Sequence, residues 1–185
     1  LLRTVATLTR PDMGRIRVWG MNLDTHAHVA RGILGYVSHH PLLYGELTAE
    51  DNLRFYARLY GLSDVDDLID AALTQVGLTR RRRDHVGNFS RGMKQRLAIG
   101  RAILHQPRVM LLDEPHTGLD HDAAAMLDEV LGTVTGSGRT VLMTTHDIDR
   151  GLALADRVAI LSNGEIAYEA DSSYLTPLEL SRQYS

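Results

Sequence analysis

The sequence contains no cysteine, only one lysine, and no apolar run that approaches the length of a membrane span. Without cysteine, the chain can form neither disulfides nor thiolate metal sites, and its composition suits a reducing compartment. A membrane-spanning helix needs about 20 predominantly apolar residues, so any membrane association has to come through a partner. The formal net charge of −3 argues against general binding of nucleic acid, with the basic tetrad RRRR at 80–83 as a local exception.

Apolar content is sufficient for a core, since 44% of the 185 residues are hydrophobic. The short apolar runs 108–112 and 140–145 are typical of strands that are buried on both faces of a parallel sheet. Helical spacing over 123–134 joins them into a strand, helix, strand unit. Further strands are predicted at 16–21 and 34–37, which gives a mixed α/β fold.

A helical insert separates the first strands from the later ones. Thr48 and Asp51 form a capping box that begins one helix, and the segment 63–77 repeats that design from Ser63. A third helix follows Ser90. Near the other end of the chain, the Asn-Gly pair at 163–164 predicts a two-residue hairpin, whereas the residues from 171 onward show no interpretable pattern.

Polar residues with chemical potential follow the two buried strands. Asp113 and Glu114 come directly after the first strand, and His146 follows the second. Carboxyl ends of parallel strands meet at one sheet edge, where open α/β sheets bind ligands. There an Asp suits Mg²⁺ and a second carboxylate can orient a water for attack on a phosphate. The alternative is that the two carboxylates have no chemical role and are simply solvated polar residues of the turn before Pro115.

The segment 88–104 offers a second site. Ser90 is expected to cap a helix whose first turn holds Gly92, leaving backbone N–H groups open to an anion. The alternative is an ordinary helix start at which Arg91, Lys94 and Arg96 are solvated.

Four motifs together resemble those of one family. FSRGM at 89–93 matches the signature segment LSGGQ of ATP-binding-cassette (ABC) transporter ATPases, and VMLLDE matches their Walker B strand. TGLD at 117–120 and the following TTHD match their D-loop and switch histidine. The resemblance implies an α/β, P-loop NTPase-like fold with a mainly parallel sheet. It makes 1–185 part of a nucleotide-binding domain, with a helical subdomain at 46–105 and the Walker B, D-loop and switch-histidine part at 106–170.

The resemblance also implies residue roles and partners. The cofactors are ATP and Mg²⁺, with Asp113 serving the metal, Glu114 acting as general base and His146 contacting the γ-phosphate. A second nucleotide-binding subunit, identical or different, packs head to tail so that two MgATP are sandwiched. Asp120 then lies at the dimer interface, and the signature residues Ser90, Arg91, Gly92 and Met93 face the partner's ATP.

Two departures from the family pattern stand out. In YVSHHP at 36–41, His39 or His40 occupies the place of the family's loop glutamine, and activity is expected to fall as that imidazole protonates near pH 6 to 7. Arg91 and Met93 replace a glycine and a glutamine of the ideal signature, so contact with the opposite nucleotide is expected to differ in detail.

The family's phosphate-binding P-loop, GxxxxGK followed by Ser or Thr, is absent from these 185 residues, whose one lysine is Lys94. In the family it precedes the helix that the first residues resemble, where Leu1, Val5 and Leu8 have helical spacing and no capping residue ahead of them. The expectation is a truncated chain that lacks the first strands and Walker A and is inactive alone. Apolar faces are then expected to be exposed at three residues, Val18, Leu112 and Leu142.

The expected function is an ATPase subunit that powers export of haem, for cytochrome c biogenesis, or of drugs. It would lie at the cytoplasmic face of the cell membrane through a transmembrane permease subunit, and no nucleic-acid partner is expected. Phe55, Tyr56 and Tyr60 either receive a helix of that permease or fill the insert's own core. The alternative functions are a non-catalytic assembly or regulatory module and a soluble ATPase of the repair or translation type.

Overall fold

The computed structural model describes residues 1–38 and 40–184, without the side chains of 183 and 184. The chain forms two compact units, Leu1–Thr144 and Thr145–Ser185, each described here by itself. None of the described helices is both long enough and apolar enough to cross a membrane.

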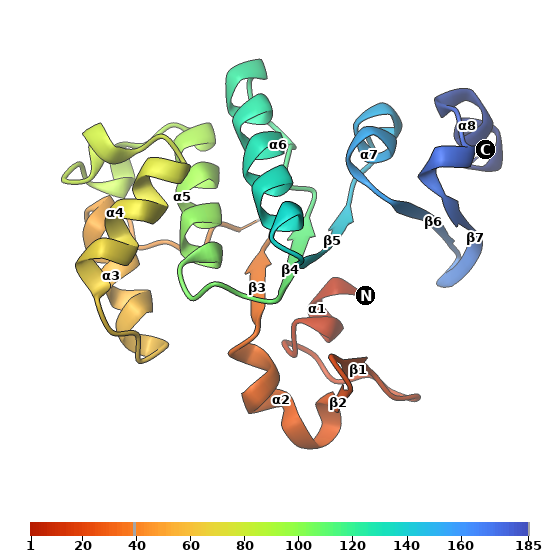
Figure 1. Ribbon diagram of the computed structural model, residues 1–185, viewed down its shortest axis with the longest axis horizontal. Helices are drawn as coiled ribbons and strands as arrows, with labels where there is room; N and C mark the ends of the chain where they lie inside the picture. The colour runs from red at the N-terminus through yellow and green to blue at the C-terminus, as the bar shows by residue number, and fades with distance from the viewer. Residues whose placement is uncertain (39, 185) are drawn as a thin grey trace. The chain divides into compact units, whose positions relative to one another are not determined.

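A three-stranded parallel sheet forms the centre of the first unit. Its strands lie in the order β3 (Leu34–Val37), β4 (Val109–Asp113) and β5 (Thr140–Thr144). Helix α6 (His121–Gly136) connects β4 to β5 and packs on β5 (Figure 1). The predicted parallel strands and the helix between them are therefore confirmed, with bounds that differ by a residue or two.

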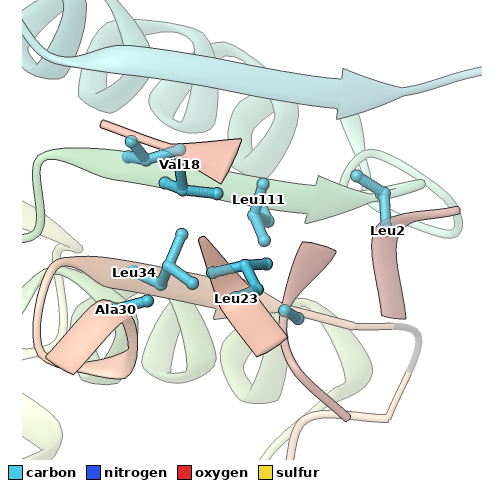
Figure 2. Close-up of a cluster of buried hydrophobic side chains, with 8 residues drawn as sticks. Leu2, Val18, Leu23, Ala30, Leu34 and Leu111 are labelled. Atoms are coloured by element: carbon cyan, nitrogen blue, oxygen red, sulfur yellow. The ribbon is translucent and has the colours of Figure 1, made fainter. Parts of the chain in front are cut away.

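One face of this sheet is covered by the first 31 residues. The elements that cover it are α1 (Leu2–Val5), β1 (Arg17–Val18), β2 (Met21–Asn22) and α2 (Leu23–Arg31). Figure 2 shows the resulting cluster of buried side chains, which includes Leu2, Val18, Leu23, Ala30, Leu34 and Leu111. The strand predicted over 16–21 is in fact two short antiparallel strands, because Trp19 and Gly20 turn the chain at positive φ.

The expectation of exposed apolar faces is wrong for Val18 and Leu112. Val18 is 8% exposed, since it packs in the cluster of Figure 2, and Leu112 is fully buried. Leu112 is on the opposite face of β4 from Leu111, because strand side chains alternate. On β5, by contrast, Leu142 is 41% exposed.

The helical insert consists of α3 (Ala49–Leu59), α4 (Val65–Gln75) and α5 (Arg91–Ile103), which lie together beside β3 (Figure 1). Two short 3-10 turns, η1 (Thr79–Arg81) and η2 (Val86–Asn88), link α4 to α5. Helix α5 touches β3 so closely that a Cβ on Gly35 would lie 2.6 Å from the Ala102 carbonyl oxygen. Glycine is therefore required at this strand position.

The capping predictions for the insert have two outcomes. Thr48 caps α3 as expected, because its hydroxyl accepts from the Asp51 N–H at 3.1 Å and donates to the Asp51 carboxylate at 2.6 Å. Ser63 does not cap α4. The N-cap is Asp64 at φ 51, without a side-chain cap bond, and the carboxylates of the first turn stabilise the helix dipole instead.

The basic tetrad at 80–83 is partly neutralised by the insert. Arg82 pairs with Glu50 at 2.9 Å and with Asp70 at 2.8 Å, and Arg81 pairs with Asp84 at 3.0 Å. These ion pairs give part of the tetrad a structural role between α3 and α4.

The second unit contains the predicted hairpin. Strands β6 (Arg157–Ser162) and β7 (Glu165–Asp171) are antiparallel, with both turn residues, Asn163 and Gly164, at positive φ. Its other elements, which the sequence pattern did not indicate, are α7 (Ile148–Leu154), η3 (Ser172–Tyr174) and α8 (Pro177–Tyr184).

Candidate functional site

The end of β4 carries two half-buried carboxylates that are oriented by β5. Thr144, the register partner of Asp113, donates its hydroxyl to Asp113 Oδ1 at 2.8 Å. The Glu114 N–H donates to the Thr144 carbonyl at 3.2 Å and lies 3.3 Å from its hydroxyl. Sequence reasoning missed Thr144, although its place at the end of the second apolar run was a usable signal. Burial and the Asp113 carboxylate together raise the pKa of nearby Tyr36.

Glu114 stands at a sharp turn. Its φ of 49 lies in the left-handed region, which a non-glycine residue rarely occupies without support from its surroundings. The support comes from Thr144 on one side and from Thr117 on the other, whose hydroxyl donates to Glu114 Oε2 at 3.3 Å. The turn thus holds Glu114 directly beyond the end of β4.

Glu114 lines a cleft of about 320 Å³ that the first unit forms by itself. The other lining residues are Pro41, Arg91, Lys94, Gln95 and Thr117. The cleft thus joins three regions that are far apart in the sequence: the end of β4, the start of α5 and the loop after β3. The wall formed by the start of α5 carries two cations, Arg91 and Lys94, which suits an anionic ligand.

The start of α5 is built as expected. The Ser90 hydroxyl accepts from the Met93 N–H at 3.2 Å, and Gly92 lies in the first turn. The alternative of fully solvated cations does not hold: Lys94 donates to the Gly87 carbonyl at 3.4 Å, and the Arg91 guanidinium lies against Gly118. Gly118 has a φ of 74, which L side chains rarely adopt, so its backbone conformation favours glycine.

The segment between Glu114 and α6 is held from two sides. Gln95 of α5 donates to the Pro115 carbonyl at 3.1 Å, and His116 pairs with Asp128 of α6 at 2.7 Å. Asp120 caps α6, because its Oδ1 accepts from the Ala123 N–H at 2.8 Å. Gln95 and His116 were not singled out by the sequence, since their partners lie 20 and 12 residues away.

His39 and His40 come shortly after β3 in the sequence. His39 lies outside the described residues. The His40 carbonyl accepts from the Ser38 hydroxyl at 2.6 Å, and the next residue, Pro41, lines the cleft with Glu114. The role predicted for either imidazole stays a prediction.

His146 belongs to the second unit, where it is exposed and precedes Asp147, the N-cap of α7. Its predicted meeting with Glu114 therefore also stays a prediction. The shared sheet edge behind that prediction is present, since β4 and β5 are parallel neighbours and β5 ends two residues before His146.

The oxygen atoms at the end of β4 suit a magnesium ion. Among the described residues no group of three His, Cys, Asp or Glu side chains could hold a metal by itself. Mg²⁺, however, usually takes only one or two protein carboxylates and completes its shell with water and phosphate oxygens. Asp113, oriented by Thr144, fits that mode.

The aromatic residues of α3 divide into two kinds. Phe55 is 36% exposed and packs edge-on against the exposed Tyr44, with ring centroids 5.1 Å apart. Tyr56 is half-buried and Tyr60 stacks on His105, with centroids 3.9 Å apart. Phe55 and Tyr44 therefore form a surface, whereas Tyr56 serves internal packing. Tyr60, which is 39% exposed, is a surface residue that packs its ring on His105.

This fold and cleft have counterparts among known proteins. The family model "ABC transporter" matches residues 1–117. A solved structure of the ATP-binding subunit of an ABC transporter superposes with a TM-score of 0.87 at 30% identity, covering 99% of this chain and 80% of that one. The chain belongs to the ABC transporter family and has the ABC ATPase fold.

Two relatives whose names state a role have a sequence identity to this chain similar to that of the solved structure. The linearmycin resistance ATP-binding protein LnrL of Bacillus subtilis is 35% identical over 164 residues, which are 88% of this chain and 53% of that protein. The daunorubicin resistance ATP-binding protein DrrA3 of Streptomyces coeruleorubidus is 33% identical over 177 residues, 95% of this chain and 56% of that protein. The chain thus spans about half the length of these relatives.

Proposed function

We propose that these residues belong to an ATP-hydrolysing subunit that powers export of a small molecule through a separate membrane permease. The observation that carries the proposal is the end of β4, where Thr144 orients the metal-binding candidate Asp113 and the next residue, Glu114, lines the cleft. Membership of the ABC transporter family supports the same activity.

Glu114 is the proposed general base. It accepts a proton from a water whose oxygen attacks the γ-phosphorus of ATP, while the bond from that phosphorus to the β–γ bridging oxygen breaks. ADP and phosphate result. The turn at φ 49, held by Thr144 and Thr117, orients the carboxylate for this role.

Asp113 is the proposed magnesium ligand. When bound, Mg²⁺ neutralises charge on the β- and γ-phosphate oxygens. The Thr144 hydroxyl fixes one carboxylate oxygen of Asp113 and so limits its rotation. Thr144 therefore positions both acidic residues at once.

The signature residues are proposed to act in a dimer. In the arrangement that the family implies, Ser90, Gly92 and Met93 at the start of α5 face the nucleotide of a second subunit, identical or not, and Asp120 lies near the interface. Arg91 adds a cation there that the ideal signature lacks. His146 is proposed to contact the γ-phosphate, and His39 or His40 to replace the loop glutamine.

The permease is proposed to dock on the exposed aromatic surface of Phe55 and Tyr44, extended by Leu42 and Leu59. These side chains are 36%, 47%, 50% and 66% exposed, so they offer an apolar area near the cleft-lining Pro41. Docking there would place the chain at the cytoplasmic face of the membrane.

The exported substrate is proposed to be a drug-like or antibiotic molecule. The relatives whose names specify a compound concern linearmycin and daunorubicin, and another is a Nod factor export protein of Rhizobium etli, 32% identical over 166 residues. The expectation of haem export for cytochrome c biogenesis has no support in these names.

Phosphate release from MgATP tests this proposal. We expect the full natural chain, reconstituted with its permease in vesicles, to hydrolyse MgATP and to accumulate a labelled antibiotic only when nucleotide is present. Nucleotide binding without any hydrolysis, alone or with the permease, would contradict the proposal and favour the non-catalytic module.

The 185 residues by themselves are proposed to bind MgATP poorly. They contain no GxxxxGK segment, and Lys94 is engaged with the Gly87 carbonyl. Carboxylates alone repel a triphosphate, which P-loop proteins hold with backbone N–H groups and a lysine. We expect no saturable isotherm at millimolar MgATP in calorimetry of the 185-residue chain, and a micromolar isotherm would refute this.

A further inference from the structure

Among the described residues no further strand pairs with the outer edge of β3, and side chains of α5 and of the turn after it bond to this edge instead. The Leu34 carbonyl accepts from His105 Nε2 at 3.0 Å, and the Tyr36 carbonyl accepts from Arg101 Nη2 at 2.7 Å. Alternate residues of a strand direct their carbonyls to the same edge, so Arg101 in the last turn of α5 and His105 in the turn that follows α5 both reach this edge.

A second helix continues these contacts outward. Tyr60, the C-cap residue of α3, stacks on His105 with an interplanar angle of 7°, and the Tyr56 ring lies 5.1 Å from the Arg101 guanidinium carbon. Two parallel rows result, one of Leu34, His105 and Tyr60 and the other of Tyr36, Arg101 and Tyr56. Arg101 is only 8% exposed, which makes the second row a buried one at its centre.

Within the described part of the chain, the second row, unlike the first, includes a hydrogen bond to the residue that follows Pro41. The Tyr56 hydroxyl donates to the Leu42 carbonyl at 2.6 Å, and Leu42 sits at φ 54 with its side chain half exposed. A leucine in the left-handed region is strained and needs such an external hold. Tyr36 and Leu42 stand on the two sides of the segment 38–41.

We propose that Arg101 and Tyr56 are positioning residues that set Pro41 against the cleft of Glu114. Arg101 holds β3 at Tyr36, Tyr56 holds the chain after Pro41 at Leu42, and the ring contact joins the two holds. The loop between them contributes Pro41 to the wall of the cleft that contains Glu114. This inference rests on the proposed hydrolytic function of that cleft.

The mechanism predicts a selective kinetic effect. Neither Arg101 nor Tyr56 lines the cleft, so their loss leaves the affinity for MgATP unchanged. A loop released at Leu42 lets the Pro41 wall drift, which lowers the population of productive geometry and hence kcat. We expect Tyr56→Phe to lower kcat about five- to tenfold at constant KM, which corresponds to about 1 to 1.4 kcal/mol.

Tyr60→Phe is the matched control. It removes the same hydroxyl from the same helix face one turn later, and among the described residues no hydrogen bond joins the Tyr60 hydroxyl to the loop. Tyr60→Phe is expected to keep the wild-type kcat. Arg101→Lys, which retains the charge and a donor, is expected to recover part of the activity that Arg101→Met loses.

Hydrogen exchange of the full natural chain provides a readout that does not depend on hydrolysis. Tyr56→Phe should speed exchange about tenfold in the peptide that covers 38–47 while leaving the peptides of β4 and α6 unchanged. Equal exchange and equal kcat in Tyr56→Phe and Tyr60→Phe would overturn the inference. A wild-type protein without hydrolysis would instead overturn the proposed function and leave the exchange result to decide on the loop.

Discussion

The strands on the two sides of β4, β3 and β5, differ in how far neighbouring elements cover them. β3 is mostly buried, and its outer carbonyls accept hydrogen bonds from Arg101 and His105. β5 is partly exposed along its whole length, and its Leu142 is 41% exposed although its register partner Leu111 is fully buried. An apolar run thus shows that a strand can be buried, while the neighbouring elements decide whether it is.

The difference also separates two kinds of polar group. On the β3 side, Arg101 and His105 bond to backbone carbonyls and hold architecture together. On the β5 side, Thr144 bonds to the half-buried Asp113 and to the Glu114 N–H, both of which border the proposed chemistry. Substitutions on the first side should therefore affect stability first, and those on the second should affect turnover first.

Among the polar contacts of β3 and β5, the largest effect on stability is expected from Arg101→Met. The change removes a charged donor from the Tyr36 carbonyl and the cation over Tyr56, so the free energy of unfolding should fall by about 3 kcal/mol. For a chain of this size the melting temperature should then drop by about 6 to 12 °C. The control is Arg108→Met, whose guanidinium lies over the exposed Trp19 ring, and equal losses in both variants would contradict the comparison.

A pH dependence of about 2 kcal/mol is expected from His105. Burial lowers the pKa of His105 to about 4, with the Arg101 charge contributing in the same direction. The folded state then binds this proton less readily than the unfolded state, so stability is retained above about pH 6.5 and lost as the pH falls toward 4.

His105→Phe tests this linkage, because it keeps a ring against Tyr60 and cannot be protonated. Between pH 7.5 and pH 4.5, urea unfolding should show a smaller loss of unfolding free energy in the variant than in the wild type. An identical loss in both proteins would show that His105 does not cause it.

Thr144→Val should have an intermediate effect on the β5 side. Loss of the hydroxyl deprives Asp113 of one hydrogen bond and should lower the free energy of unfolding by about 1 kcal/mol. Hydrolysis should fall about tenfold, since both acidic residues lose orientation. Thr140→Val, at the exposed start of the same strand, is the control, and a similar fall in its hydrolysis rate would rule out the positioning role of Thr144.

The smallest effect on stability is expected at the exposed part of β5. Leu142→Thr should change the free energy of unfolding by less than about 0.5 kcal/mol while raising the protein concentration at which light scattering begins. The same change at its register partner, Leu111→Thr, should unfold the first unit. A soluble, folded Leu111→Thr variant would mean that the two sides of the sheet are not as different as described.

Local signals predicted the framework of the fold correctly. The Thr48 cap, the Ser90 cap and the Asn163-Gly164 hairpin each depend on residues within a few positions of one another. The parallel strands were equally readable from their apolar runs, but the burial predicted on both faces holds for β4 and is wrong for β5, which is partly exposed. Ser63 failed as a cap because the chain reaches α4 through a left-handed Asp64, which no local pattern indicated.

The candidate site was predictable in its chemistry and not in its supports. Asp113, Glu114 and Ser90 stand in motifs, whereas Thr144, Gln95 and His116 gain their roles only through partners that the fold brings near. Tyr56 and Arg101 likewise gain their roles only through contacts that the fold creates, with each other and with the carbonyls of Leu42 and Tyr36. Nothing in the sequence shows that Arg101 meets a carbonyl of β3 or that the Tyr56 ring meets Arg101.

The central claim is that Glu114 activates water for hydrolysis of MgATP, and Glu114→Gln tests it most directly. In the full natural chain we expect this variant to bind MgATP like the wild type and to release phosphate about 100-fold more slowly, or slower still. Glu129→Gln, an exposed position on α6, should keep the wild-type rate. Unchanged phosphate release from Glu114→Gln would contradict the account.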